Sequence, residues 1–297
     1  MSQSNALDRR LHAFRPDLAD KRLEGRVTAT KFVEGTTKQI RAPVAPMRKA
    51  PDAALGLENE ALLGELVTVF EDSDGWSWGQ LQRDGYVGYF PSAALSADIH
   101  VATHRVRAPA TFIYPAPNIK RAPLAHLSLN AQLAVVGQDT TERFVELATG
   151  GFVIARHVAP ISEHATDFVE VAEQLLYTPY LWGGRSRLGL DCSGLVQLSL
   201  EAARRACPRD TDLAVAAIGE PVPVSNGLED LLRGDIVYWP GHCGIMIDAV
   251  MLLHANGFHM ATVIEPLSQA VRRIRKSATE NNASGPEIAA IRRIHAA

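Results

Sequence analysis

The sequence is poor in cysteine and has no long hydrophobic run. Its 297 residues include 3 cysteines at irregular spacing, which argues against a disulfide framework and fits reduced thiols in a cytosol. Apolar runs such as 213–218 are far too short to cross a membrane, so no membrane partner is expected. The first ten residues lack an apolar stretch behind their basic residues, so we expect no export signal and a cytoplasmic location.

An excess of charge of one sign is also absent. The chain has 30 lysines and arginines against 33 aspartates and glutamates, for a formal net charge of −3. Such a chain has no broad basic field, so no nucleic-acid partner is expected and the partners are predicted to be small. The length favours more than one domain, and the 46% hydrophobic content is ample for packed cores. The oligomeric state has no signature in the sequence.

A glycine-rich loop leads to Cys192, at the start of a predicted helix. Small or apolar residues at positions 195, 196, 199, 200 and 203 share one helix face with position 192. The unpaired N–H groups and the dipole of a helix N-terminus favour a thiolate, the form of sulfur that attacks carbonyls. Cys192 is therefore a candidate nucleophile, although a lone cysteine is more often a small core residue.

Two histidines are candidates for a base and the residue that orients it. The chain over 233–256 predicts two strands joined by a tight turn. If this hairpin is symmetric about Asp248, His242 and His254 lie directly opposite, with β-carbons roughly 5 Å apart. One ring would accept the thiol proton and later protonate the leaving amine, while the other fixes the first ring's tautomer. By strand alternation, Cys243 is expected to face the other side.

The same side chains are also compatible with a metal site. Cys192, His242 and His254 are all residue types that bind zinc, but the C-x-x-C spacings of zinc sites are absent from the sequence. We therefore predict no metal and no cofactor.

Several ordered motifs resemble the NlpC/P60 family of papain-like cysteine peptidases. They are Pro179-Tyr-Leu-Trp-Gly-Gly184, Gly189-Leu-Asp-Cys-Ser-Gly-Leu195, Gly234-Asp-Ile-Val237, His242-Cys-Gly-Ile245 and Leu253-His-Ala255. The resemblance covers roughly residues 165–297. It implies that Cys192 is the nucleophile, His242 the general base and acid, and His254 the third, orienting residue. It also implies an oxyanion hole that uses the backbone N–H of the nucleophile.

The chain before this region has short β-like runs and few helical periods until about Ile161. Residues 62–95 and 127–161 form a weak repeat in which Tyr86 and Phe152 stand 66 positions apart. Both copies resemble bacterial SH3 domains, which are small barrels of about five or six short strands. The predicted architecture is α+β, with an N-terminal arm (1–35), two SH3-like β-barrels (36–98 and 99–162) and a papain-like NlpC/P60 catalytic domain (163–297).

The resemblance extends to cytosolic enzymes that recycle murein peptides, in which the first SH3-like module closes one end of the cleft. A cleft closed there would admit a peptide with a free amino terminus and exclude one still joined to a glycan. The implied substrate is L-Ala-γ-D-Glu followed by a diamino acid, cleaved after D-Glu through a thioester on Cys192. An amidase or acyltransferase on the same fold, or a non-catalytic peptide- or wall-binding protein, stays open as an alternative.

The resemblance also assigns substrate contacts. Asp191 matches an acidic residue of the family, and an N-cap role fits it equally well. Tyr180 is assigned to the cleft and Trp182 to the core, since a buried phenol needs a partner. Further candidates are Ser193, as a hydroxyl near the substrate or a cap, Tyr86 and Glu60, as an amine-binding pair from the first barrel, and Asp210, although the glutamine usual after it is missing. Arg185 and Arg187 are candidates to attract the carboxylates of an acidic peptide, although exposed loop arginines are more often only solvated, and His259 is expected at the surface.

Overall fold

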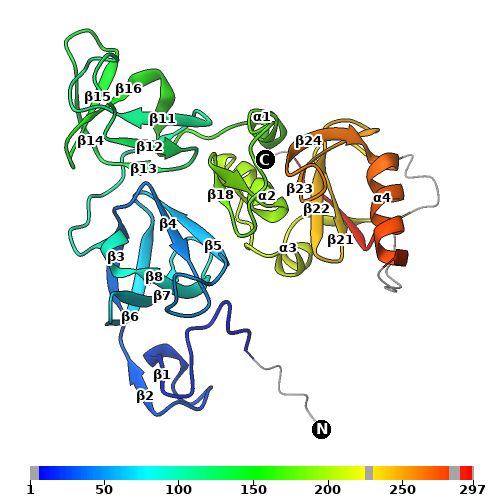
Figure 1. Ribbon diagram of the computed structural model, residues 1–297, viewed down its shortest axis with the longest axis horizontal. Coiled ribbons are helices and arrows are strands. Elements are labelled where there is room, and N and C mark those ends of the chain that lie inside the picture. Colours follow the sequence, from blue (N-terminus) through cyan, green and yellow to red (C-terminus); the bar gives the residue numbers. More distant parts are fainter. Residues whose placement is uncertain (1–6, 225–229, 281–287, 296–297) are drawn as a thin grey trace. The chain divides into compact units, whose positions relative to one another are not determined.

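The computed structural model describes residues 7–224, 230–280 and 288–295 and divides the chain into two compact units, Met1–Ser162 and Glu163–Ala297 (Figure 1). The first unit is built from strands and short 3-10 turns, and the second combines helices with a larger sheet. Within the described ranges, no helix is both long enough and apolar enough to span a bilayer.

The first barrel combines a five-stranded sheet, of order β8-β7-β6-β3-β9, with the β4-β5 hairpin. Apolar side chains alternate along β6 and bury Val67 and Val69, while Asp74 and Gly75 form a two-residue turn with positive φ at both positions, which suits a twisted hairpin. The strands are β3 (Thr36–Ile40), β4 (Val44–Met47), β5 (Asn59–Leu62), β6 (Leu66–Ser73), β7 (Trp76–Leu81), β8 (Val87–Pro91) and β9 (Leu95–Ser96), with the 3-10 turn η2 (Ser92–Ala94).

The second barrel repeats this order with shorter strands, which form the sheets β13-β10-β17, β11-β12 and β14-β15-β16. Its strands are β10 (His104–Val106), β11 (Ala110–Ile113), β12 (Ala125–Ser128), β13 (Gln132–Leu133), β14 (Val135–Gln138), β15 (Phe144–Leu147), β16 (Phe152–Ile154) and β17 (Val158–Pro160), with the 3-10 turn η3 (Ala155–His157). Each barrel thus ends in a 3-10 turn followed by a short closing strand.

Matching backbone hydrogen bonds show that the two barrels are repeats. The Gly64 N–H donates to the Ile40 carbonyl at 2.9 Å, and 66 positions later the Asn130 N–H donates to the Val106 carbonyl at 2.9 Å. A shared hydrogen-bond pattern at a fixed period indicates equivalent strands and corners. The predicted period of 66 residues therefore holds for the N-terminal part of each barrel.

The predicted alignment of Tyr86 in the first repeat with Phe152 in the second is wrong by one position. In the first barrel Gln80 pairs with Val87, and in the second Glu146 pairs with Phe152. Phe152 is therefore equivalent to Val87, because the turn before β16 is one residue shorter than the turn before β8. A turn residue lost between two strands shifts every later position without changing the fold.

The N-terminal arm packs on the first barrel. It contains β1 (Leu18–Asp20), the 3-10 turn η1 (Lys21–Leu23) and β2 (Lys31–Val33), and β1 pairs parallel with β2. Ala13 and Leu18 form one buried cluster with Phe70 and Trp78 of the barrel. The Arg15 guanidinium lies 4.4 Å from the Trp78 ring centroid. The arm therefore covers apolar side chains that the barrel leaves exposed on that face.

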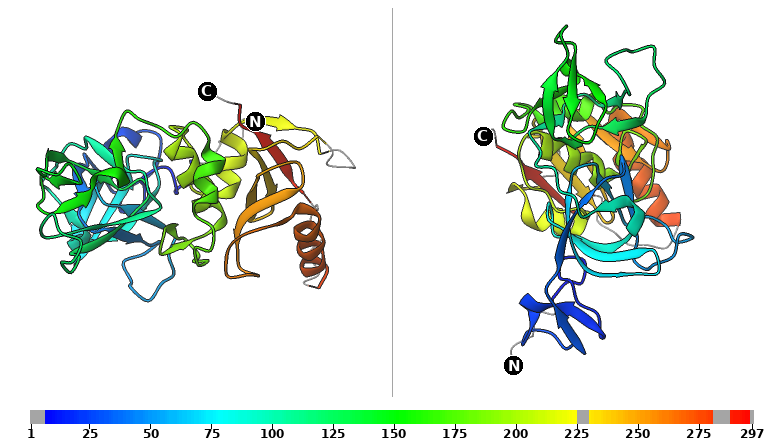
Figure 2. Two further views of the ribbon diagram at one scale, coloured as in Figure 1. Left: turned by 90° about the horizontal axis from the view of Figure 1, so that it is seen from above. Right: turned by 90° about the vertical axis from the view of Figure 1, so that its left-hand side faces the viewer.

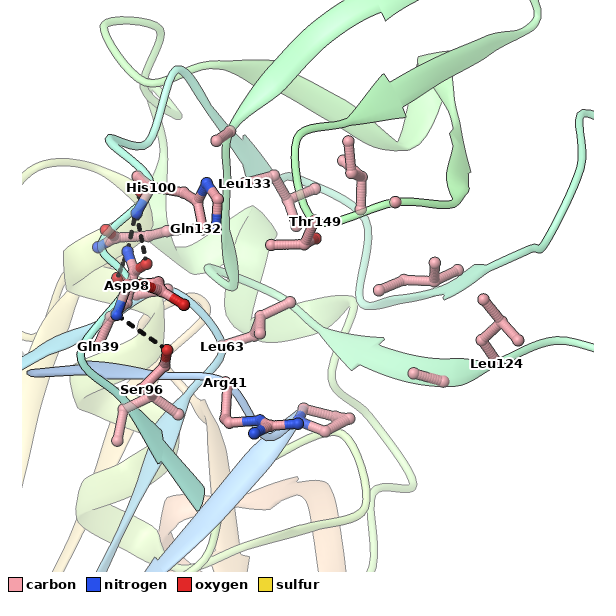
Figure 3. Close-up of a pocket in the computed structure, with 18 residues that line it drawn as sticks. Gln39, Arg41, Leu63, Ser96, Asp98, His100, Leu124, Gln132, Leu133 and Thr149 are labelled. Atoms are coloured by element: carbon pink, nitrogen blue, oxygen red, sulfur yellow. Dashed lines mark hydrogen bonds between the residues drawn. The ribbon is translucent and has the colours of Figure 1, made fainter. Parts of the chain in front are cut away.

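A cavity of about 520 Å³ lies within the first unit, between its two barrels (Figure 3). The Gln39 side chain forms part of the cavity wall. Its amide nitrogen donates to the carbonyls of Gly64 and His100 at 3.0 Å, and its amide oxygen accepts from the His100 N–H at 2.9 Å. The apolar part of the wall includes Leu63 and Leu133. Tyr86 and Glu60 do not line this cavity.

The second unit is organised by a six-stranded sheet of order β20-β25-β21-β22-β23-β24. The central strands are almost fully buried, because both faces of the sheet are covered by helices. The strands are β20 (Glu220–Val222), β21 (Asp235–Trp239), β22 (His242–Met246), β23 (Met251–Asn256), β24 (Ala261–Pro266) and β25 (Ala290–Arg293), and a separate small hairpin pairs β18 (Arg185–Ser186) with β19 (Gly189–Leu190).

Helices lie on both faces of this sheet. The helix α2 (Cys192–Ala202) packs against β22 and β23 and against α1 (Phe168–Glu173), whereas α4 (Leu267–Glu280) lies on the opposite face (Figure 2). The short helix α3 (Thr211–Ala217) follows α2 in the chain. Nine of the eleven residues 192–202 are apolar or small, and all residues of α2 but Glu201 are buried. A helix buried all round holds its first residue firmly against the sheet.

Candidate active site

Cys192 is the first residue of α2, as the sequence predicted. The Asp191 carboxylate caps the helix by accepting from the Gly194 N–H at 2.7 Å. A Cβ on Gly194 would lie 2.3 Å from the carbonyl oxygen of Gly184, so only glycine allows the loop to approach the helix this closely. The Cys192 thiol is buried and lies 4.0 Å from the carbonyl oxygen of Gly241.

The surroundings of Cys192 favour its thiolate. The thiol of Cys243 hydrogen-bonds to Cys192 and lowers its pKa, and a hydrogen bond and the positive charge of His242 act in the same direction against the effect of burial. The pKa of the Cys243 thiol is raised, because the Cys192 sulfur accepts its hydrogen bond and because it is buried. Cys243 therefore stays protonated while Cys192 ionises.

Cys243 faces the other side of β22 from His242, as expected, and this is the side on which its thiol meets Cys192. Strand alternation places Cys243 and His242 on opposite faces of β22, and α2 packs across this strand. The face that carries Cys243 is the face that meets the helix bearing Cys192, so its thiol reaches the nucleophile.

His242 and His254 are in direct contact, with 2.8 Å between Nε2 of His242 and Nδ1 of His254. Their predicted direct opposition was wrong, however. The hairpin pairs Ile245 with Leu253, and this register sets Gly244 opposite His254, so that His242 is the diagonal neighbour. Diagonal side chains on one face of a sheet are still within reach of each other when they are long or aromatic.

Glycine at position 244 makes the diagonal contact possible. A Cβ at this position would lie 3.0 Å from the Cβ of His254 and 2.8 Å from a methyl group of Leu252. The absence of a side chain leaves the space between the two strands to the His242 ring. This glycine belongs to the motif His242-Cys-Gly-Ile245, in which only the first residue was assigned a role from the sequence.

The contact continues from His254 to a carboxylate that the sequence did not reveal. Nε2 of His254 lies 2.7 Å from the Glu265 carboxylate, which in turn accepts from Arg273 of α4 at 2.5 and 2.7 Å. Burial lowers the pKa of His254 to about 4, so the ring is neutral near pH 7. Although burial opposes it, hydrogen bonds from His254 and Arg273 hold the pKa of Glu265 at about 2.

Asp191 and Ser193 belong to a buried network with Arg209. The Arg209 guanidinium donates to the Asp191 carboxylate at 2.6 Å and to the Ser193 hydroxyl at 2.7 Å. Asp191 also accepts from the N–H of Gly183 at 2.9 Å. The carboxylate therefore stabilises the helix start and the preceding loop, and Arg209, which carried no prediction, neutralises its charge. Whether Asp191 or Ser193 also contacts a substrate stays a prediction.

Tyr180 lies close to the nucleophile. Its backbone pairs with Leu190, and its N–H donates to the carbonyl of Met260 at 3.0 Å. Burial and the negative charges of Cys192 and Asp191 raise the pKa of its phenol to about 12, so the hydroxyl keeps its proton. A protonated hydroxyl beside the sulfur is able to donate to a bound peptide.

Two expectations for the neighbouring loop were wrong. Trp182 is not a core residue, since 67% of its surface is exposed. Arg185 is not a solvated loop residue, because it is fully buried and pairs with Glu201 of α2 at 2.5 Å. Arg187 is partly buried and donates to the Thr178 hydroxyl. The arginines of this loop hold it to the rest of the unit, and the tryptophan is the aromatic that it presents to the outside.

The remaining predicted contacts lie further along the chain. Asp210 is half-buried at the N-cap position of α3, and His259 is exposed, as expected. Tyr86 and Glu60 are both buried in the first unit, Tyr86 within the core cluster of the barrel and Glu60 on β5. The roles assigned to Asp210, Tyr86 and Glu60 in substrate binding stay predictions. In the described part of the chain, no group of three or more His, Cys, Asp or Glu side chains could hold a metal ion.

Two family models match the chain. Residues 47–95 match the bacterial dipeptidyl-peptidase Sh3 domain, and residues 177–278 match the NlpC/P60 family. The second match contains Cys192, His242, His254 and Glu265.

Curated relatives with similar sequences are peptidases by name. The chain is 28% identical to dipeptidyl-peptidase 6 of Lysinibacillus sphaericus, over 73% of this chain and 86% of the relative. It is 26% identical to the gamma-D-glutamyl-L-lysine dipeptidyl-peptidase of Bacillus subtilis, over 70% of this chain and 77% of the relative. These relatives support peptidase activity for this chain.

A solved structure shares the fold. The crystal structure of an NlpC/P60 family protein from Bacillus cereus has a TM-score of 0.68 and 21% sequence identity, over 86% of this chain and 99% of that one. The predicted α+β architecture, with an SH3-like barrel before a papain-like domain, is thereby confirmed. The chain carries an NlpC/P60 family domain that is preceded by a bacterial dipeptidyl-peptidase SH3 domain.

Proposed function

We propose that the chain is a cysteine peptidase that hydrolyses the bond between γ-D-Glu and a diamino acid in murein peptides with a free N-terminal L-Ala. The observation that carries the proposal is the line of contacts from Cys192 through His242 to His254. The name of the Bacillus subtilis relative, gamma-D-glutamyl-L-lysine dipeptidyl-peptidase, supports the choice of bond. A role in murein peptide recycling in the cytosol is part of the proposal.

Cys192 acts as the nucleophile in this reaction. Its thiolate attacks the γ-carbonyl carbon of D-Glu, and the C–N bond breaks as protonated His242 gives its proton to the amine of the diamino acid. Water then attacks the thioester on Sγ while His242 takes a proton from it. This step releases L-Ala-D-Glu with a free γ-carboxyl group and restores the thiolate and the imidazolium.

The start of α2 is suited to stabilise the oxyanion that forms in both steps. Cys192 occupies the first helical position, where the backbone N–H has no acceptor within the helix. Asp191 caps the N–H of Gly194. The N–H of Cys192 is therefore left to donate to the substrate oxygen, and one such donor is worth about 10²–10³ in kcat.

The test is product analysis on a defined peptide. Purified protein and a Cys192→Ala variant are incubated with L-Ala-γ-D-Glu-L-Lys, and release of L-Ala-D-Glu is followed by mass spectrometry. The proposal predicts release by the unmodified protein only. Equal release from both proteins would overturn it.

A second substrate tests the requirement for a free amine. The N-acetylated peptide should be cleaved at least tenfold more slowly than the free peptide. If Glu60 takes part in binding the amine, Glu60→Gln should slow cleavage of the free peptide and leave the rate on the acetylated peptide unchanged. The ratio of the two rates would then fall. Equal rates on both peptides would remove the free amino terminus from the proposal.

Two alternatives have distinct outcomes. An amidase or acyltransferase would pass the acyl group from Cys192 to an added amine such as hydroxylamine in preference to water. A non-catalytic binder would hold the peptide without consuming it, and its Cys192 would react with iodoacetamide no faster at pH 6 than Cys207 does. The depressed pKa of Cys192 and its contact with His242 favour catalysis over both silent binding and an idle thiol.

A further inference from the structure

The Glu265 carboxylate stands at the end of the line of contacts that starts at Cys192. One of its oxygens lies 2.7 Å from Nε2 of His254 and 2.5 Å from the Arg273 guanidinium, and the other lies 2.7 Å from the same guanidinium. His254 is fully buried, and the side chain of Glu265 is 8% exposed. Such a carboxylate is ionised, and it accepts two charge-assisted hydrogen bonds from Arg273 besides its contact with His254.

An ionised carboxylate decides which nitrogen of His254 carries the proton. A lone pair on Nε2 would face the negative oxygen, so the proton of the neutral ring resides on Nε2. Nδ1 of His254 is then an acceptor, and Nε2 of His242, 2.8 Å away, must donate to it. The remaining nitrogen of His242, Nδ1, is the one free to exchange a proton with Cys192.

Asn256 competes for the same atom. Its amide nitrogen lies 3.0 Å from Nε2 of His254, and its amide oxygen is fixed by accepting the N–H of His259 at 2.8 Å. A neutral amide donor favours an unprotonated Nε2, which is the opposite tautomer. The charged carboxylate prevails as long as it is present. Without it, Asn256 would move the proton to Nδ1, where it meets the Nε2 proton of His242.

We propose that Glu265 is a positioning residue that sets the tautomer of His254 and thereby aims His242 at the Cys192 sulfur, with Arg273 holding the carboxylate in place. The inference rests on the proposed function, but it concerns the reactivity of the thiol and not the choice of peptide. It adds two residues from β24 and α4 to the Cys192, His242 and His254 set. The competing role is a plain ion pair that fastens α4 to the sheet.

Several ionisable and polar side chains surround His242, His254 and Glu265. Cys192 faces His242, and Cys243 hydrogen-bonds to Cys192 from the other side of β22. Asn256 and Glu265 face His254, and Arg273 faces Glu265. Phe258 lies over the Arg273 guanidinium, with 4.6 Å from its ring centroid to Cζ.

The test is the pH profile of Cys192 alkylation by iodoacetamide, which needs no peptide. Glu265→Leu should slow alkylation at pH 6 by at least tenfold and move the midpoint of the profile upward. Adding Asn256→Asp to that variant replaces the competing donor with a carboxylate and should restore at least a third of the rate. On L-Ala-γ-D-Glu-L-Lys, Glu265→Leu should lower kcat by the same factor and leave KM within twofold.

Asp235→Leu is the matched control. Asp235 is another buried carboxylate of this unit and accepts two hydrogen bonds from Arg293 at 2.8 Å, away from the histidines. The Asp235→Leu variant should lower the melting temperature without moving the pH profile of Cys192 alkylation. If Glu265→Leu lowers only the melting temperature, or if Asn256→Asp rescues nothing, the proposal is wrong. If alkylation behaves as expected but no peptide is cleaved, the proposed function fails and the role of Glu265 stands.

Discussion

The guanidinium of Arg209 donates to the carboxylate of Asp191 across 2.6 Å, and both side chains are buried at the start of the helix that carries Cys192. The same carboxylate accepts the N–H groups of Gly183 and Gly194. The Asp191 carboxylate thus fixes the helix start that carries Cys192. Its negative charge repels the thiolate, and the positive charge of Arg209 offsets this repulsion.

Removal of Arg209 should be strongly destabilising. Arg209→Leu leaves Asp191 as an uncompensated buried charge, and the expected loss in free energy of unfolding is about 3–5 kcal/mol. Urea denaturation measures it. The control is Arg233→Leu, which breaks more exposed ion pairs with Asp167 and Glu173 and should lose less than about 1 kcal/mol. Equal losses for the two variants would contradict the prediction.

Removal of the Cys243 thiol should make Cys192 less acidic. Cys243→Ala deletes the hydrogen bond that contributes most to the lowered pKa of Cys192, so the thiolate forms at higher pH. The rate of iodoacetamide alkylation at pH 6 should fall several-fold, whereas at pH 9.5 it should approach that of the unmodified protein. Cys243→Ser keeps a donor and should show a smaller effect. A profile that does not move in Cys243→Ala would exclude the thiol as a donor.

A methyl group at position 244 should disturb the histidine pair. Gly244→Ala places a carbon 3.0 Å from the Cβ of His254, which pushes this ring away from His242. We expect kcat to fall at least tenfold with KM nearly unchanged. Gly257→Ala, in the turn that follows β23, is the matched control, because its Cβ would meet only Tyr180, at 3.9 Å. Equal activity of the two variants would show that the contact tolerates the displacement.

Acid should destabilise the second unit through His254. The pKa of this ring is lowered from 6.5 to about 4 by burial, so between these values the unfolded chain binds a proton that the folded chain does not. The free energy of unfolding therefore decreases as pH falls from about 6.5 to about 4, by about 3 kcal/mol from this residue alone. Urea denaturation at several pH values measures the slope. His254→Gln should remove this part of it, and an unchanged slope would assign the acid sensitivity to other groups.

Local patterns in the sequence were enough to find the helix that starts at Cys192 and the hairpin that carries His242 and His254. Both depend on short-range signals, namely a helical face after a glycine-rich loop and two apolar runs around a turn. The register of the hairpin was not predictable, because a turn one residue longer or shorter moves each cross-strand neighbour. The catalytic roles of the three side chains stay predictions.

The partners of these residues come from parts of the chain that carry no local signal. Glu265 and Arg209 are an ordinary glutamate and an ordinary arginine in the sequence, and only the packing of β24 and the loop after α2 brings them to His254 and Asp191. For Trp182 and Arg185 the residue type itself misled the prediction, since the tryptophan was expected to be buried and the arginine exposed. Residue type predicts burial on average, but a short loop held by one buried arginine exposes its tryptophan and buries its charge.

The docked N-terminal arm decides where a shortened protein can begin. A chain cut at residue 36 would keep all strands of the first barrel, yet it would lose Ala13 and Leu18 and uncover Phe70 and Trp78. The Val87 N–H of β8 would also lose its acceptor, the carbonyl of Arg10, at 2.8 Å. A self-contained first barrel therefore begins at Arg10 or before it, and a version that starts after Leu18 exposes the aromatic side chains of Phe70 and Trp78.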